Sequence, residues 1–179
     1  MMEVSISKKV VLRYRLTLEL PPGMADATQI RQILMNLITN ASEAIGDRSG
    51  YISITTGAIY CDAEYLASTE FSDDIEEDMY VYLEVSDTGC GMDKEVLSQL
   101  FEPFFTTKYT GRGLGLSSVL GIVRGHRGAV KVYSEPDQGT TFKVLLPVCH
   151  EDLDYDPDDL SSDSASEWKG EGTVLFADD

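Results

Sequence analysis

The sequence predicts an α+β fold, a two-layer sandwich in which a mixed, mostly antiparallel sheet carries about three helices on one face. Segments in which apolar and polar residues alternate recur along the chain and indicate strands. Between them lie segments in which apolar residues return every three or four positions, which indicates amphipathic helices. Clusters of glycine and proline separate these segments and mark turns.

The first half of the chain supplies three strands and one long helix. Residues 6–20 alternate, are rich in β-branched and aromatic types, and are closed by the Pro-Pro-Gly run at 21–23. Asp26 is the expected N-cap of a helix whose apolar stripe continues until Gly46. Residues 51–59 and 79–85 alternate again and predict two strands. The acidic stretch 61–78 between them is expected to be an irregular, solvated connection.

The second half supplies two helices and a hairpin. Residues 94–101 have a short helical pattern, and a Thr-, Lys- and Gly-rich stretch from Pro103 to Gly113 predicts a mobile loop. A helix over 114–123 should end at the following glycines, Gly125 and Gly128. The last two strands, 129–134 and 140–146, are joined by the Pro-Asp-Gln-Gly turn at 136–139.

Charge and cysteine content exclude several classes of function. With 14 basic and 31 acidic residues the formal net charge is -17, which disfavours contact with nucleic acid or anionic membrane. Cys61, Cys90 and Cys149 are scattered, without a CxxC pair, so neither a disulfide framework nor a zinc site is expected. No apolar run approaches the roughly 18 residues of a membrane span, and no signal peptide is recognisable. The sequence therefore predicts a soluble, cytoplasmic piece.

The composition divides the chain into three parts. Residues 1–148 carry the patterned segments and predict one domain. Residues 149–171 are dominated by Asp, Glu and Ser and predict a disordered linker. Residues 172–179 predict a short apolar strand that ends in the acidic pair Asp178 and Asp179.

Asn36 and Asn40 lie four positions apart and share one face of the long helix, beside its apolar stripe. An asparagine carbonyl is a hard, neutral oxygen that can complete the coordination shell of Mg²⁺ when phosphates and waters supply the other ligands. Taken alone, most such pairs are asparagines that hydrogen-bond a neighbouring loop.

Two glycine-rich stretches predict a nucleotide site. Asp87 ends a strand and is followed by Gly89, Gly91 and Met92; its carboxylate can accept from an exocyclic amine, although an ordinary Asp-Gly turn has the same pattern. The second stretch lies at the start of a helix, where free backbone N–H groups favour binding of a phosphate. Lys108 precedes it on the predicted loop, from which a lysine can close over a triphosphate. This second stretch consists of Gly111, Arg112, Gly113, Leu114, Gly115 and Leu116. It is neither a Walker A loop nor a Rossmann fingerprint.

The two histidines are candidates for a phosphate acceptor, and neither fits the role. His126 lies at the glycine-marked end of a helix, where a capping or surface role is expected. His150 precedes Glu151, as in an acceptor helix, but it runs into the acidic linker without apolar periodicity.

In this order the motifs resemble the catalytic and ATP-binding domain of histidine kinases, within the fold family shared with gyrase, the Hsp90 chaperones and MutL (the Bergerat-type ATP-binding fold). Residues 36–41 resemble the N box, 87–92 the G1 box, 101–105 the F box, 111–116 the G2 box and 139–142 the final glycine-threonine motif. The resemblance covers about residues 6–147.

The resemblance implies ATP and Mg²⁺ as ligands. Asn40 would coordinate Mg²⁺ with Asn36 nearby, and Asp87 would accept from the adenine amino group. Thr140 or Thr141 would line the adenine pocket together with the two G1 glycines, and Lys108 with the G2 backbone would hold the phosphates. Where gyrase and the chaperones carry a glutamate that activates water, Asn36 carries an amide, which is no general base. Transfer to a protein is therefore expected in place of hydrolysis.

The expected partners are a histidine-bearing dimerisation domain outside this chain and a receiver domain or response regulator, because residues 172–179 resemble the first strand of a receiver. The isolated chain should therefore bind nucleotide without autophosphorylating, and should be monomeric. Two alternatives remain: a serine kinase of the anti-sigma type, which shares the fold, and a nucleotide-binding interaction module without activity.

Overall fold

A computed structural model describes residues 9–23, 25–70, 75–107 and 113–149 of the chain. These residues belong to one compact unit, Met1–Cys149. The predicted linker from residue 150 onward and the receiver-like strand lie outside the described residues, as do Lys108, Gly111 and Arg112. Within the described ranges no helix is long and apolar enough to cross a membrane.

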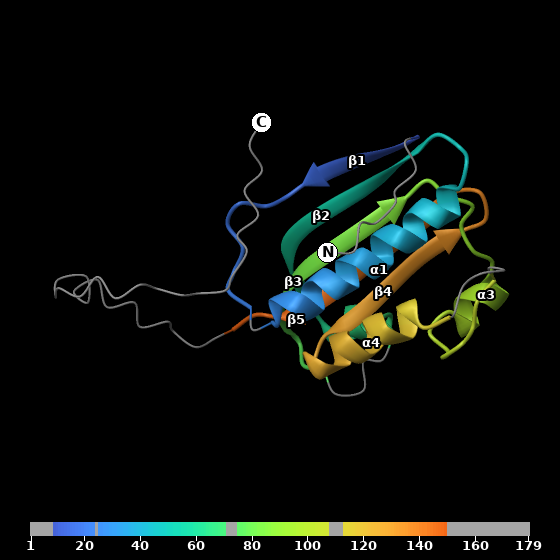
Figure 1. The fold of residues 1–179 in the computed structure, drawn as a ribbon. Helices are drawn as coiled ribbons and strands as arrows, with labels where there is room; N and C mark the ends of the chain where they lie inside the picture. Colours follow the sequence, from blue (N-terminus) through green and yellow to red (C-terminus); the bar gives the residue numbers. More distant parts are fainter. Residues whose placement is uncertain (1–8, 24, 71–74, 108–112, 150–179) are drawn as a thin grey trace, which may run out of the picture. The chain divides into compact units, whose positions relative to one another are not determined.

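A five-stranded sheet in the order β1-β2-β3-β5-β4 forms one layer (Figure 1). β1 pairs with β2 in parallel, whereas the other three pairings are antiparallel, so the predicted mixed and mostly antiparallel sheet is confirmed. Its strands are β1 (Val10–Arg15), β2 (Gly50–Cys61), β3 (Asp78–Asp87), β4 (Ala129–Glu135) and β5 (Gly139–Pro147).

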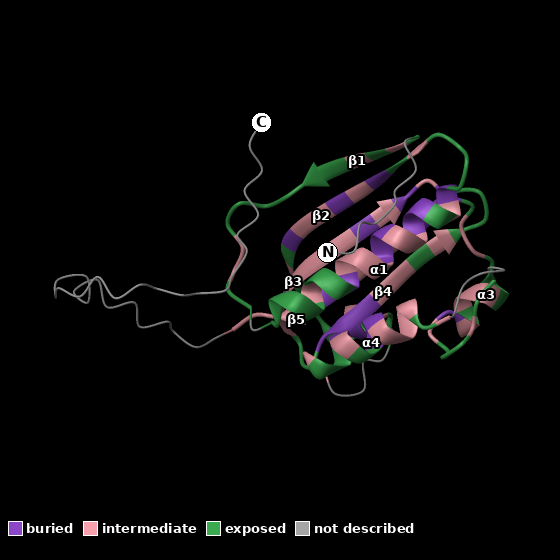
Figure 2. Cartoon of the chain, in the orientation of Figure 1, coloured by how far each residue is buried: buried purple, intermediate pink, exposed green. Residues whose placement is uncertain are grey.

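The second layer is formed by α1 (Ala27–Ile45) and α4 (Gly115–Gly125), with the short α3 (Lys94–Gln99) beside them (Figure 1). The expected caps of α1 are present: the Asp26 carboxylate accepts from the Gln29 N–H at 2.9 Å, and Gly46 ends the helix with φ of 63°. α1 and α4 bury their apolar stripes against one sheet face (Figure 2). This core includes Ile33, Leu37, Ile52, Val85, Val119, Val123, Phe142 and Val144.

The first strand is shorter than its pattern predicts. Pairing with β2 ends at Arg15, and Thr17 then bonds the backbone and hydroxyl of Thr56. The alternating leucines beyond it, Leu16 and Leu18, are exposed, the latter by 99%. Alternation alone predicted a strand here because it does not reveal where the partner strand turns away.

The prediction of an irregular connection over 61–78 was wrong in part. Cys61 is the last residue of β2, and α2 (Ala63–Ala67) follows with Asp62 as its N-cap. Leu66 of α2 packs with Cys61, Tyr80, Ala129 and Leu145 in a second cluster, on the sheet face opposite α1 and α4. A helix of five residues is too short to display a 3.6-residue period in the sequence.

Candidate functional site

Asp87 lies at the end of β3 and is only 6% exposed. One carboxylate oxygen accepts the Gly89 N–H at 2.7 Å, which shapes the turn that follows the strand. The residue lines an open pocket of about 440 Å³ at the ends of β3, β4 and β5. The other lining residues are Ser86, Leu97, Val132, Tyr133, Ser134, Glu135, Gln138, Gly139, Thr140 and Thr141.

The G1 turn, residues 87–92, is docked tightly on the β4–β5 hairpin. The Asp137 N–H donates to the Cys90 carbonyl at 2.7 Å. Gly91 and Gly139 have positive φ, and a Cβ on Gly91 would overlap the Glu135 carbonyl, while one on Gly139 would overlap that of Asp87. Only glycine permits this approach of two backbones. The hairpin turn thus holds Asp87 in place.

Ser134 is a residue of this region that the sequence reasoning missed. Its hydroxyl accepts from the Met92 N–H at 2.8 Å and contacts the Thr140 hydroxyl at 2.9 Å and the Gly139 carbonyl at 3.1 Å. It therefore ties the G1 turn to the glycine-threonine motif. The hairpin register, which pairs Ser134 with Thr140, is the signal that could have found it.

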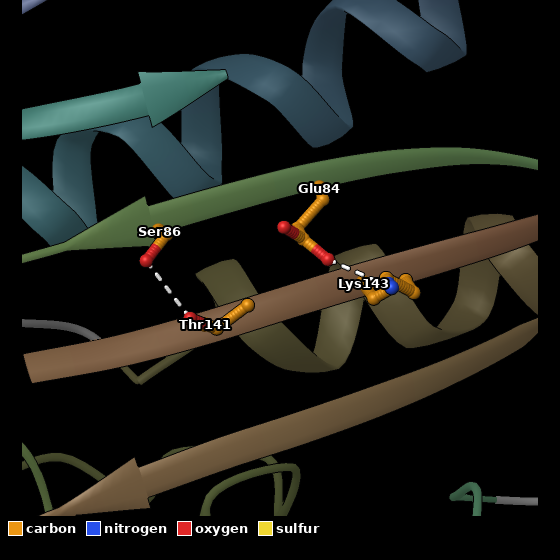
Figure 3. A network of polar contacts seen from close by, with 4 residues as sticks. All are labelled: Glu84, Ser86, Thr141 and Lys143. Atoms are coloured by element: carbon orange, nitrogen blue, oxygen red, sulfur yellow. Dashed lines mark hydrogen bonds and ion pairs between the residues drawn. The ribbon is translucent and has the colours of Figure 1, made fainter. Parts of the chain in front are cut away.

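The two threonines after Gly139 lie on opposite faces of β5. Thr140 is 6% exposed and shares its side with the core residue Phe142, the side covered by α1 and α4. Thr141 points to the other side, where its hydroxyl donates to the Ser86 hydroxyl at 2.8 Å (Figure 3). Of the two candidates, Thr140 is the one that lies on the helix side and contacts Ser134.

On the same side as Thr141, Lys143 and Glu84 form an ion pair at 2.8 Å (Figure 3). Burial by itself would lower the pKa of Lys143. The hydrogen bond and the negative charge of Glu84 together have the larger effect, so the pKa of Lys143 is raised above its usual value. The Lys143 ammonium also lies 4.6 Å from the ring centroid of Tyr82. These charges belong to the face opposite α1 and α4.

The asparagine pair meets the start of α4. Asn36 and Asn40 are both half-buried on α1. A Cβ placed on Gly115 would lie 3.8 Å from the Asn36 side-chain oxygen and 4.0 Å from the Asn40 side-chain nitrogen. The N box and the last part of the G2 box are therefore adjacent in space.

The F box contacts the G2 box directly. The Phe104 N–H donates to the Gly113 carbonyl at 2.9 Å, and both residues have positive φ, 68° and 65°. Phe104 is 75% exposed, although it is a large apolar residue. Leu114 follows as the N-cap of α4, and within the described ranges no side chain caps this helix start. Leu116 packs on the core.

The G1 turn is also anchored on α1. The Cys90 N–H donates to the Ala44 carbonyl at 3.0 Å, and a Cβ on Gly89 would lie 2.6 Å from the Ala44 Cβ. Ala44 is one helical turn beyond Asn40. One helix therefore carries the asparagine pair, abuts the start of α4, and supports the turn that holds Asp87.

The sequence profile of the family described as histidine kinase-, DNA gyrase B-, and HSP90-like ATPase matches residues 25–150. Among curated relatives, the sensor kinase CckA of Brucella abortus is 37% identical over 181 aligned positions, covering 97% of this chain and 19% of that protein. The sensory histidine kinase/phosphatase NtrB of Rhizobium meliloti is 43% identical over 131 positions, covering 72% of this chain and 32% of that protein. The chain thus spans about a fifth to a third of the length of these relatives.

Solved structures of histidine kinases share the fold. The catalytic domain of ThkA is 30% identical with a TM-score of 0.59, covering 78% of this chain and 80% of that one. Full-length ShkA, solved in complex with AMPPNP, is 29% identical with a TM-score of 0.61, covering 79% of this chain and 26% of that one.

Proposed function

The chain belongs to the histidine kinase-, DNA gyrase B- and HSP90-like ATPase family and is the ATP-binding catalytic domain of a two-component histidine kinase, and we propose that it binds Mg-ATP. From this nucleotide the γ-phosphoryl group would be transferred to a protein histidine. The observation that carries this proposal is the arrangement around α1, which brings Asp87, the asparagine pair and the start of α4 to one side of the sheet.

Asp87 selects adenine. Its carboxylate is almost fully buried, and the Gly89 N–H holds one oxygen, so the group is oriented before a ligand arrives. A carboxylate accepts from the exocyclic amine of adenine and would face the carbonyl oxygen that guanine carries instead. Thr140, linked to Ser134, lines the same pocket and adds a second polar contact.

The phosphates lie toward the start of α4. Its first N–H groups point out of the helix, and the helix dipole favours a negative group there. Lys108, Gly111 and Arg112 precede this start in the sequence, and we assign them, with Gly113 and Gly115, to phosphate binding.

The donor set fits a magnesium ion that arrives with ATP. Among the described residues no group of three His, Cys, Asp or Glu side chains could hold a metal. The amide oxygen of Asn40 is a suitable single ligand when phosphate oxygens and water provide the others. Bound Mg²⁺ would neutralise phosphate charge, while the protein positions the nucleotide.

The amide of Asn36 favours transfer over hydrolysis, because an amide does not take a proton from water at neutral pH. The acceptor is a histidine of a separate dimerisation domain, and the phosphoryl group passes on to a receiver domain or response regulator. Within the described residues the single histidine, His126, is engaged at both ring nitrogens.

Calorimetric titration of the chain with Mg-ATP tests the proposal. We expect saturable binding of one ATP, much weaker binding of GTP, and little or no incorporation of γ-labelled phosphate. Absence of ATP binding would refute the nucleotide site. Acid-labile, base-stable labelling of the isolated chain would instead refute the assignment of the acceptor histidine to another domain.

A further inference from the structure

His126 lies at the C-terminal cap of α4, at the opposite end of that helix from the proposed phosphate site. Its Nδ1 is 2.8 Å from the Ile122 carbonyl oxygen, and its Nε2 accepts the Asp26 N–H at 3.1 Å. Because a carbonyl oxygen only accepts, Nδ1 carries the proton and Nε2 is left as the acceptor. The neutral ring thus bridges the end of α4 and the N-cap of α1.

The backbone around His126 is held by its own hydrogen bonds. Arg127 adopts positive φ of 53°, and the Gly128 N–H bonds the Val123 carbonyl at 2.9 Å. The Arg127 N–H bonds the Arg124 carbonyl, also at 2.9 Å. This is the Schellman arrangement at a helix end. On this fixed backbone, the contact of Nδ1 with the Ile122 carbonyl orients the ring so that Nε2 faces the Asp26 N–H.

α1 and α4 run antiparallel and approach each other at three points along their length. Asp26 meets His126 at one end, and the Gln32 side-chain amide donates to the Ser118 hydroxyl at 3.0 Å in the middle. At the other end, Gly115 faces the asparagine pair of α1. An 11-residue helix is about 16 Å long, so a tilt at one end displaces the other.

We infer that His126 is a positioning residue for the phosphate end of the nucleotide site: through Nε2 it anchors α4 on α1 and so sets where the start of α4 lies relative to Asn36 and Asn40. The inference rests on the proposed function, since it concerns how that site holds triphosphate. It also gives His126, which is unsuited as a phosphate acceptor, a structural role.

A pair of substitutions separates the two ring nitrogens. His126→Asn keeps a polar group near the Nδ1 position and removes the Nε2 acceptor, whereas His126→Gln reaches the Nε2 position. In calorimetric titrations we expect His126→Asn to weaken Mg-ATP binding about tenfold, and His126→Gln to stay within about threefold of wild type, as for loss or retention of one hydrogen bond. Adenosine, which lacks phosphates, should bind all three proteins within about twofold.

Gly125→Ala is the matched control, because a Cβ at Gly125 meets nothing within 4 Å at the same helix end. It should leave the affinity for Mg-ATP unchanged. Equal ATP affinities of His126→Asn and wild type would overturn the inference, as would an equal loss in the Asn and Gln variants or a parallel loss of adenosine. If the wild type bound no ATP, the proposed function would fail and the inference with it. If the wild type bound ATP and the His126 variants bound it with the same affinity, the inference alone would fail.

Discussion

The two ends of the proposed nucleotide site are built differently. At the adenine end, the G1 turn and the β4–β5 hairpin approach so closely that Gly91 and Gly139 leave no room for a side chain. At the phosphate end, the start of α4 has no side-chain cap within the described residues, and Phe104 beside it is exposed. From this contrast we expect base recognition in the proposed site to depend on backbone packing, and phosphate binding to depend on how α1 and α4 are held together.

Gly139→Ala should have the largest effect, because it inserts a methyl group where the β4–β5 hairpin lies against the backbone of the G1 turn. The residue has φ of 94°, and an added Cβ would overlap the Asp87 carbonyl. We expect a loss of about 3 kcal/mol in the free energy of unfolding, together with loss of nucleotide binding. Urea unfolding measures the first and calorimetry the second. Gly121→Ala, where a Cβ meets nothing within 4 Å, should stabilise α4 by about 0.5–1 kcal/mol.

Asp87→Asn tests base recognition without a change of shape. The variant keeps an oxygen for the Gly89 N–H but replaces the second oxygen by a donor. ATP affinity should fall about 100-fold, since a charged acceptor is lost in a buried place. Asp93→Asn, which retains the cap of α3, should bind ATP as wild type does. Equal calorimetric affinities for wild type and Asp87→Asn would remove Asp87 from the adenine site.

Asn40→Leu tests the phosphate end. The substitution removes the amide oxygen that we assign to Mg²⁺ at similar side-chain volume. The ratio of ATP affinities with and without Mg²⁺ should fall about tenfold. Adenosine affinity is the internal control, because it reports any general damage to the pocket. An unchanged ratio would contradict the metal assignment.

Ser134→Ala should weaken adenosine and ATP binding alike, by about threefold to tenfold, because it releases Thr140 and the Met92 N–H from their shared partner. Calorimetry with both ligands measures this. Ser98→Ala is the control, since that hydroxyl donates to the Glu95 carbonyl within α3 at 2.8 Å. A loss of affinity for ATP but not for adenosine would place Ser134 at the phosphate end and contradict its assignment to the adenine end.

Lys143→Met should have the smallest effect. The pair with Glu84 is partly exposed, at 18% and 25%, so solvent screening reduces its value. We expect at most about 1 kcal/mol in the free energy of unfolding by urea denaturation and no change in ATP affinity. A large loss of affinity would mean that the face opposite α1 and α4 takes part in nucleotide binding.

Much of the architecture could be predicted because it is local. The Asp26 cap, the apolar stripe of α1 and the stop at Gly46 all lie within one continuous segment, and their periodicity is readable without the rest of the chain. The early end of β1 at Arg15 could not be predicted, because it depends on pairing with a strand far away in the sequence. The helix α2 could not be predicted because five residues are too few to display a helical period.

By itself, the sequence determined the chemistry that this protein carries: a carboxylate before a glycine turn, an amide pair on a helix and a glycine-rich helix start, in an order that resembles histidine kinases. The tertiary structure decided which side chains cooperate. It separated Thr140 from Thr141, joined Ser134 to the G1 turn, and set His126 against the N-cap of α1. Periodicity encodes the face on which a residue lies, but contacts between distant segments arise only when the whole chain packs.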